Sequence, residues 1–408
     1  MQQQSHSPLS QSIEKANINN SFTIAQVIPA LNSGGVERGV VDLAKAIKQE
    51  GYNSIVISSG GILTYQLREA GITHINLAVN SKNPITIFRN IAKLANIIKE
   101  HKINILHIRS RAPMFSGYFA AKKTGCKLVS TIHGSYSTNL IFQDSIIKKY
   151  YNSLIYCADR VIAVSQFVKN LSISNYQNLN HRFFNPEKLQ DIAVVHRGVD
   201  LKYFNSEAIK KNAIIELIRK WQIPEDKKII IMPARITGWK GHEFLLNALA
   251  RVSGDFFCVF IGSDHGHEKL RVKLEKKAIN LGLGGKVKFV GNCKEMATAY
   301  TLSYLVISAS IRPEAFGRIA IEAQASNRLV IATNIGGSLE TIIDNSTGFL
   351  VEVNNIEALA LKIDEALNLP ADKYLAITAN ARNHIIANFS NDKMYEQTIA
   401  IYRNLLDI

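Results

Sequence analysis

The sequence lacks any long hydrophobic run. Among its 408 residues, no apolar stretch reaches the roughly 18 residues of a membrane span. The first 20 residues, MQQQSHSPLSQSIEKANINN, have neither an apolar core nor a basic start, so we expect no secretory signal there. The Gln, Ser and Asn content of residues 1–21 instead predicts a disordered tail.

Cysteine is also scarce. The four cysteines are scattered and show no metal-ligand spacing: Cys126, Cys157, Cys258 and Cys293. We therefore expect small buried thiols in a reducing cytoplasm. The chain also has no Asp-x-Asp motif and no His/Cys cluster, so we expect no metal site.

Acidic residues are few in the first half of the chain. Residues 1–205 carry 23 Lys and Arg against 11 Asp and Glu, whereas residues 206–408 carry 25 against 22. Between Lys82 and Lys127 there are ten basic residues and one acid, Glu100. A basic surface of this kind indicates an anionic partner, which leaves nucleic acid, an anionic membrane or a phosphorylated substrate open.

Short apolar runs alternate with longer helical patterns along the whole chain, which is typical of parallel α/β sheets. The predicted strands of the first half are 22–29, 54–59, 103–108, 127–132, 160–165 and 192–200. Those of the second half are 228–234, 256–262, 286–291, 304–309, 328–333 and 348–353.

This length favours two doubly wound parallel-sheet domains over one long sheet. We place the first domain at residues 22–200, the second at 201–388, and a C-terminal helix at 389–408 that can pack on either. In such folds ligands bind at the carboxyl ends of the strands. We therefore expect a ligand in a cleft between two facing Rossmann-like sheets.

Four loops after predicted strands carry residues suited to phosphate or sugar binding. Gly34 and Gly35 precede a helix, where backbone N–H groups are free to bind an anion. Arg235 and Lys240 lie five residues apart in one loop and can converge on a diphosphate. The third loop, 312–317, opens a helix, and the fourth contains the glycine pair of GGSLE at 336–340.

Two carboxylates, Glu314 and Glu322, flank the start of the helix that follows the third loop. The spacing alone carries little information, because Glu357 and Glu365 repeat it in an amphipathic helix, where we interpret them as surface charges. The position of the first pair after a strand favours a nucleotide-sugar site.

Taken in order, these segments resemble a family. GGVERG, STIHG, ADRVIAVS, RGVD, RITGWKG, PEAFGRIAIEA, GGSLETI and TGFLV resemble a family 4 retaining glycosyltransferase of the GT-B fold, of the bacterial cell-envelope or lipopolysaccharide type, over residues 22 to about 390. The sequence departs from that pattern at Ala234, Ala315 and Arg197, where the family often has Gly, Gly and Asn.

The resemblance implies the donor-site roles. Arg235 and Lys240 would hold the donor diphosphate together with the amides of Phe316, Gly317 and Arg318. Glu322 would bind the ribose and Glu314 the hydroxyls of the donor sugar.

The remaining roles fall in the first domain. Gly34 and Gly35 would face the donor phosphates or the acceptor, and His133 matches the active-site histidine of the family. The implied reaction transfers a hexosyl group with retention at C1, with a UDP- or GDP-linked sugar as substrate, no cofactor and no metal.

The acceptor side is predicted from charge. Arg109 and Arg111 follow a strand and are candidates to meet a phosphate on the acceptor. The helical pattern 84–102 is expected to bury Ile87, Ile91, Leu94 and Ile98 and to expose basic residues. Our hypothesis is a cytoplasmic enzyme, peripheral on the inner face of the membrane, with a lipid-linked or lipopolysaccharide-core acceptor. A saccharide acceptor in solution is the alternative.

Two other functions stay open at this point. A basic nucleic-acid-binding α/β protein would use the first half, but no RRM, KH, helix-turn-helix or zinc-finger signature is present, so we expect no nucleic-acid partner. Another GT-B enzyme, such as a sugar-nucleotide 2-epimerase, would use the same donor loops.

Overall fold

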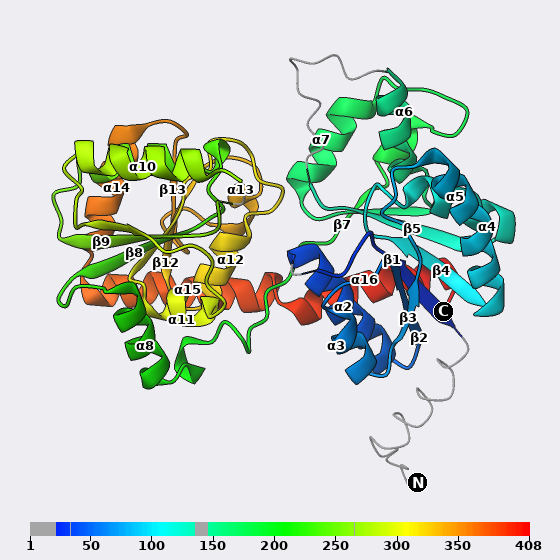
Figure 1. Cartoon of the computed structure of the whole chain (residues 1–408), viewed down its shortest axis with the longest axis horizontal. Coiled ribbons are helices and arrows are strands. Elements are labelled where there is room, and N and C mark those ends of the chain that lie inside the picture. The colour runs from blue at the N-terminus through cyan, green and yellow to red at the C-terminus, as the bar shows by residue number, and fades with distance from the viewer. Residues whose placement is uncertain (1–21, 33, 135–145, 265) are drawn as a thin grey trace, which may run out of the picture. The chain divides into compact units, whose positions relative to one another are not determined.

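The structure, a computed structural model, describes residues 22–32, 34–134, 146–264 and 266–408, with backbone only at 146–148 (Figure 1). The tail predicted at 1–21 lies outside the described residues. The chain divides into two compact units, which we name unit 1 (residues up to Val195, with Tyr395–Ile408) and unit 2 (His196–Met394). This division falls inside the segment 192–200, which the sequence predicts as one strand.

Unit 1 is built on a seven-stranded parallel sheet of order β3-β2-β1-β4-β5-β6-β7. Its strands are β1 (Thr23–Val27), β2 (Asn53–Ser58), β3 (Thr73–Asn76), β4 (Ile103–Ile108), β5 (Lys127–Ile132), β6 (Arg160–Ala163) and β7 (Ala193–Val194). Every residue of β1 is buried, as expected of a central strand covered on both faces.

Helices lie on both sides of this sheet (Figure 1). They are α2 (Gly35–Gln49), α3 (Thr64–Glu69), α4 (Pro84–Glu100), α5 (Met114–Thr124), α6 (Ile146–Ser153), α7 (Gln166–Tyr176) and the 3₁₀ turns η1 (Leu154–Cys157) and η2 (Pro186–Leu189). Local sequence sets their starts. At α4, for example, the Asn83 side chain accepts from the Ile85 N–H and Pro84 occupies the first turn.

Unit 2 contains a six-stranded parallel sheet of order β10-β9-β8-β11-β12-β13. Its strands are β8 (Lys228–Pro233), β9 (Phe256–Ile261), β10 (Val287–Phe289), β11 (Leu305–Ser308), β12 (Leu329–Thr333) and β13 (Phe349–Val351). Its helices are η3 (Ser206–Ala208), α8 (Lys211–Trp221), η4 (Gly238–Lys240), α9 (His242–Leu249), α10 (Glu268–Asn280), α11 (Met296–Leu302), α12 (Arg318–Ala325), α13 (Ser338–Thr341), α14 (Ile356–Leu367) and α15 (Ala371–Asn388). Two parallel Rossmann-like sheets therefore confirm the predicted fold class.

The C-terminal helix α16 (Asn391–Leu406) contributes most of its length to unit 1. The Tyr402 hydroxyl lies 2.5 Å from Nδ1 of the buried His107 in β4, and Arg403 pairs with Glu50 at 2.6 Å. These contacts explain why a segment from the far end of the sequence belongs with the first sheet.

One burial prediction is wrong at α4. Leu94 and Ile98 are buried, but Ile87 and Ile91 are only half-buried, and Asn90 and Ala95 are buried in their place. The apolar stripe is therefore rotated, and it leaves large apolar side chains of this helix exposed to solvent. No described helix is both long enough and apolar enough to cross a membrane.

Candidate functional site

The loop after β8 carries a buried ion pair. The Lys240 ammonium donates to Oε1 of Glu314 at 2.7 Å, and the two side chains are only 11% and 15% exposed. The hydroxyl of Ser310 donates to the same carboxylate oxygen. The Lys240 ammonium also lies 4.4 Å from the centre of the Trp239 ring. The loops after β8 and β11 thus share one charged centre, because these two strands are neighbours in the sheet.

Close backbone packing holds these two loops together. The Ile311 N–H donates to the Trp239 carbonyl at 2.9 Å. Gly241 has a φ of +80°, and a Cβ at this position would lie 1.8 Å from the Ala309 carbonyl oxygen. Only glycine satisfies both conditions. The sequence motif GWKG therefore needs its second glycine to bring the Lys240 loop against the loop after β11.

Glu322, the second carboxylate, lies in α12 and has two partners. Tyr300 donates its hydroxyl to Oε2 at 3.0 Å, and Arg318 donates to Oε1 at 2.8 Å. Burial, and then the negative charge of Glu322, raise the pKa of the Tyr300 phenol well above its usual value, so the phenol stays a donor.

Exposure separates this carboxylate pair from the one with the same spacing. The side chains of Glu314 and Glu322 are 15% and 14% exposed, whereas those of Glu357 and Glu365 are 67% and 48% exposed. The second pair forms ordinary surface ion pairs, as expected from its amphipathic helix.

The glycine-pair loop after β12 packs against the start of α12. The Gly337 N–H donates to the Glu314 carbonyl at 2.9 Å, and a Cβ on Gly337 would lie 2.3 Å from Cα of the buried Phe316. Gly317, with φ +76°, then turns the chain into α12 at Arg318. The amides at this helix start carry the positive end of the helix dipole, which favours an anion.

Arg235 does not join this centre. Its side chain is exposed, and it makes no hydrogen bond or ion pair with any described residue. In the structure the Lys240 ammonium binds Glu314, and the convergence of Arg235 and Lys240 on one diphosphate stays a prediction.

Unit 1 gathers its candidate residues at one sheet edge. Because β1, β4 and β5 are adjacent and parallel, their carboxyl ends meet there. Gly34 caps the start of α2 after β1, Arg109 follows β4, and His133 follows β5 and is half-buried. Gly35 is the first residue of α2.

The two arginines after β4 differ in surroundings. Arg109 is 7% exposed, its Nε has no hydrogen-bond partner among the described residues, and burial lowers its pKa. No carboxylate of the described chain forms an ion pair with it. Arg111 instead donates to the Asn152 side chain at 3.1 Å.

Several partners in these networks are not predicted from the sequence. Ser310 and Tyr300 bind the two carboxylates, and His196 lies 2.8 Å from Glu340 and packs against Phe316. Tyr300 stands 22 positions before Glu322, and no local pattern joins them. Ser310 lies only four positions before Glu314, so its contact with that carboxylate could have been predicted from their proximity in the sequence.

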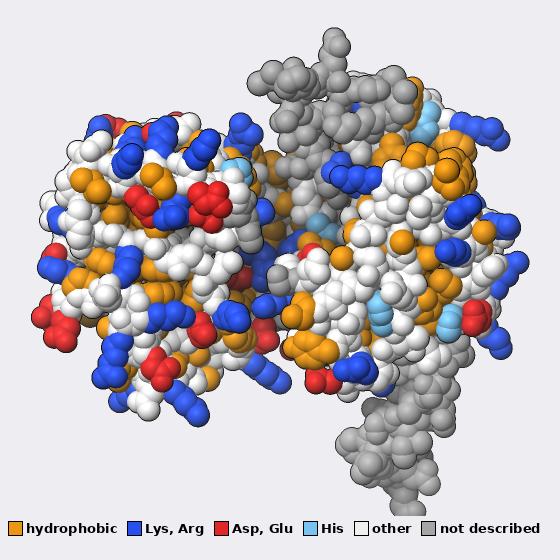
Figure 2. All heavy atoms as spheres, in the orientation of Figure 1, with side chains coloured by type: hydrophobic (Ala, Val, Ile, Leu, Met, Phe, Trp, Pro, Cys, Tyr) orange, Lys and Arg blue, Asp and Glu red, His pale blue; other side chains and the backbone are white. Residues whose placement is uncertain are grey.

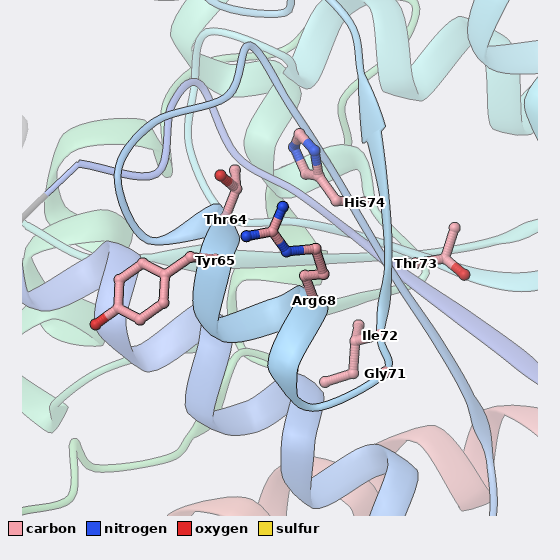
Figure 3. A pocket seen from close by; sticks show the side chains of 7 residues that line it. All are labelled: Thr64, Tyr65, Arg68, Gly71, Ile72, Thr73 and His74. Carbon is pink, nitrogen blue, oxygen red and sulfur yellow. The ribbon is translucent and has the colours of Figure 1, made fainter.

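A hollow of about 490 Å³ lies elsewhere in unit 1, between α3 and β3 (Figure 3). Its lining residues are Thr64, Tyr65, Arg68, Gly71, Ile72, Thr73 and His74. Figure 3 shows Arg68 on the helix and His74 on the strand. It is a wide-open groove and contains none of the predicted site residues. In the part of the chain that the structure describes, no three His, Cys, Asp or Glu side chains gather as a metal site would require.

Comparison with known proteins finds glycosyltransferases along both halves of the chain. The family model for Glycosyltransferase Family 4 matches residues 33–203, and that for Glycosyl transferases group 1 matches residues 213–384. The crystal structure of a glycosyltransferase from Rickettsia africae ESF-5 is 42% identical, with a TM-score of 0.85, over 95% of this chain and 99% of that one.

More distant relatives match nearly the whole chain. The N-acetyl-alpha-D-glucosaminyl L-malate synthase of Bacillus anthracis is 25% identical over 93% of this chain and 95% of its own. The structure of Anabaena Alr3699/HepE in complex with UDP and glucose is 20% identical, with a TM-score of 0.78, over 94% of this chain and all of that one. At that identity the likeness concerns the fold alone.

Proposed function

Since this chain belongs to the family 4 glycosyltransferases of the GT-B fold, we propose that it transfers a hexosyl group from a UDP- or GDP-linked sugar to a lipid-linked or lipopolysaccharide-core acceptor. The proposed reaction retains the configuration at C1 and uses no metal. A cytoplasmic location belongs to the proposal, since all four cysteines are free thiols.

The buried pair of Lys240 and Glu314 carries this proposal. Departure of a nucleoside diphosphate from C1 builds negative charge on the leaving oxygen, which a buried ammonium and a helix N-terminus can stabilise. Lys240 and the start of α12 supply these two groups from adjacent loops. An incoming diphosphate would compete with Glu314 for the ammonium and release its carboxylate to accept from sugar hydroxyls.

We assign Glu322 to the nucleoside end of the nucleotide-sugar donor. Its two oxygens already accept from Tyr300 and Arg318, which fix the orientation of the carboxylate. Each oxygen retains a further lone pair, so a ribose hydroxyl can donate to it. Arg235, exposed and without a partner among the described residues, is available for the phosphates.

The reacting face and the acceptor are assigned to unit 1. In a retaining transfer the acceptor oxygen forms a bond to C1 on the face where the bond to the diphosphate breaks, and the acceptor proton passes to the departing phosphate. We assign His133 to the reacting sugar and Gly34 and Gly35 to the donor phosphates or the acceptor. Buried Arg109, which forms no ion pair with a described carboxylate, supports an acceptor with an anionic group, because a buried guanidinium is costly unless a counter-charge neutralises it.

The test is a transfer assay with UDP- and GDP-hexoses and with lipid-linked and lipopolysaccharide-core acceptors. We expect nucleoside diphosphate release only when the acceptor is present. Lys240→Ala should lower kcat/KM by about 100-fold or more, because it removes charge stabilisation in the transition state. Lys276→Ala, at an exposed lysine of α10, is the matched control and should leave it unchanged.

Two outcomes would count against the proposal. Near-normal turnover by Lys240→Ala would remove the diphosphate assignment. Conversion of the donor to its 2-epimer, without any acceptor, would assign the chain to the alternative GT-B reaction.

A further inference from the structure

Unit 1 exposes a group of large apolar side chains that we name the aromatic surface. Its members come from α4, α5, α6 and the segment after α7: Ile85, Phe88, Phe115, Phe119, Tyr151 and Phe183. Ile85 is 62% exposed, Phe88 61% and Phe183 44%. Figure 2 shows apolar side chains gathered over α4 and α5, with Lys and Arg side chains around them. Isolated exposed apolar residues are common, but a continuous group marks an interaction site.

The rings pack on one another, mostly edge to face. Phe88 meets Phe115 at 5.4 Å with an interplanar angle of 78°, and Phe119 meets Phe183 at 5.8 Å and 84°. Phe115 and Phe119 join these two pairs at 4.8 Å. The cluster is therefore one rigid apolar patch assembled from segments that lie far apart in the sequence. Such mutual packing leaves few ring faces open for stacking on nucleic-acid bases.

Positive charge surrounds the aromatic surface. The Arg182 guanidinium lies 5.7 Å from the centre of the Phe183 ring, and the Lys122 ammonium lies 5.8 Å from that of Tyr118. Arg89 in α4 and Lys123 in α5 are exposed as well. The sequence from Lys82 to Lys127, which includes both helices, contains a single acid.

The aromatic surface lies close to the edge that carries the acceptor candidates. Helices α4 and α5 begin at the carboxyl edge of the sheet, where the chain leaves β3 and β4. Phe88 and Phe115 stand in or near the first turns of these helices, and Arg109 precedes α5 by five residues. A ligand carried at a surface bound here would be near the proposed acceptor site.

We propose that the aromatic surface attaches unit 1 to an anionic lipid bilayer. Aromatic and aliphatic side chains enter the interfacial layer, while lysines and arginines around them bind anionic headgroups. A second copy of the chain is a poorer partner, because pairing this face with itself would bring like charges together. The attachment adds to the proposed sugar transfer and does not depend on which sugar is moved.

The experiment is flotation of the full chain with vesicles of phosphatidylcholine, alone or mixed with phosphatidylglycerol, at low and raised salt. We expect binding only to the mixed vesicles, weakened by salt because surface charges are screened. Phe88→Ser with Phe183→Ser, at two exposed positions, should lower the partition coefficient about tenfold or more. Lys122→Gln with Arg182→Gln should lower it about 25-fold, since each basic residue near the surface contributes about fivefold.

Matched controls come from unit 2. Ile279 and Leu361 are 67% and 70% exposed, and their replacement by Ser should leave vesicle binding unchanged, as should Lys273→Gln with Lys276→Gln. UDP binding measured without vesicles should be equal in all variants. This readout separates a failed attachment from a failed sugar-transfer proposal.

Any one of the following results would overturn the attachment. One is no flotation with anionic vesicles at low salt, and another is equal flotation of the wild type and the Phe88→Ser/Phe183→Ser variant. A third is self-association of the wild type that this variant, and no other, abolishes. The last would make a second copy the occupant. Binding of single-stranded RNA that the same variant abolishes, without vesicle binding, would favour nucleic acid instead.

Discussion

Arg109 and Arg111 stand two positions apart, yet the fold gives them different surroundings. Arg109 is buried without a carboxylate among the described residues, while Arg111 has a hydrogen bond to Asn152. A desolvated charge without a counter-charge destabilises the folded state unless an anionic ligand neutralises it. The sequence alone proposes both residues for the acceptor, whereas their surroundings favour Arg109.

We predict opposite effects on stability and binding at this position. Arg109→Met should raise the free energy of unfolding by about 1–3 kcal/mol, because an apolar side chain replaces a buried charge that has no carboxylate counter-charge. It should also abolish the thermal stabilisation given by inorganic phosphate, measured with UDP saturating the donor site. Arg111→Met, the control, should lose at most about 1 kcal/mol and keep the phosphate effect. A phosphate effect that survives in Arg109→Met would contradict the assignment.

A second prediction for a single residue concerns Tyr300, whose hydroxyl donates a hydrogen bond to Glu322. Tyr300→Phe removes one donor from the carboxylate but leaves Arg318 in place. We expect a loss of about 1 kcal/mol in stability and a five- to tenfold rise in KM for the donor, with kcat nearly unchanged. Steady-state kinetics check this, and Tyr304→Phe, at a half-buried tyrosine of the same unit, is the control. A fall in kcat at constant KM would instead assign Glu322 to the reacting sugar.

At the scale of elements, the neighbouring strand determines whether an edge segment forms a strand, and the local hydrophobic pattern does not. Strand β3, with the sequence THIN, has no apolar alternation and is not predicted, but its register with β2 pairs Ile55 with Thr73 and Ser58 with Asn76. The opposite error occurs at 192–200, where only Ala193–Val194 pair with β6 before the chain enters unit 2. Edge strands depend on a neighbour for their hydrogen bonds, which sequence periodicity does not report.

The turn between η4 and α9 gives an element-scale prediction. Gly241→Ala should lower the free energy of unfolding by about 2–4 kcal/mol, because a Cβ would collide with the Ala309 carbonyl at a left-handed φ. Gly238→Ala is the matched control, since a Cβ there meets nothing within 4 Å. Denaturant unfolding measures the free energy of unfolding of both variants. Equal losses in the two would show that position 241 does not require glycine.

At the scale of the whole molecule, the unfolding of unit 2 can be followed separately from that of unit 1. The sequence has two tryptophans, Trp221 and Trp239, and both lie in unit 2. Tryptophan fluorescence therefore reports the unfolding of unit 2 within the full chain.

This readout suits a pH prediction at His242. The side chain is 2% exposed, and burial lowers its pKa to about 4 from the usual 6.5. Between these values the unfolded state binds more protons, so the free energy of unfolding of unit 2 should fall as the pH drops from 6.5 to 4. The loss attributable to His242 is about 3 kcal/mol.

The check is denaturant unfolding at several pH values, followed by tryptophan fluorescence. His242→Leu should flatten the dependence over this range, whereas His267→Leu, at an exposed histidine of the same unit, should not. An unchanged slope in His242→Leu would show that this imidazole is not what destabilises unit 2 in acid.

The sequence by itself determined the two parallel α/β units and the family, because hydrophobic periodicity and turn residues are local properties that survive in one dimension. It also located the loops of the candidate site, including the carboxylates at 314 and 322. Tertiary structure alone decided which partners these groups have: Lys240 for Glu314, Tyr300 for Glu322, and none among the described residues for the Arg109 Nε. It likewise assembled the aromatic surface, whose residues come from four separate segments. The reason is physical, since contacts between distant segments follow from sheet order and packing, and neither is a property of any single stretch of the chain.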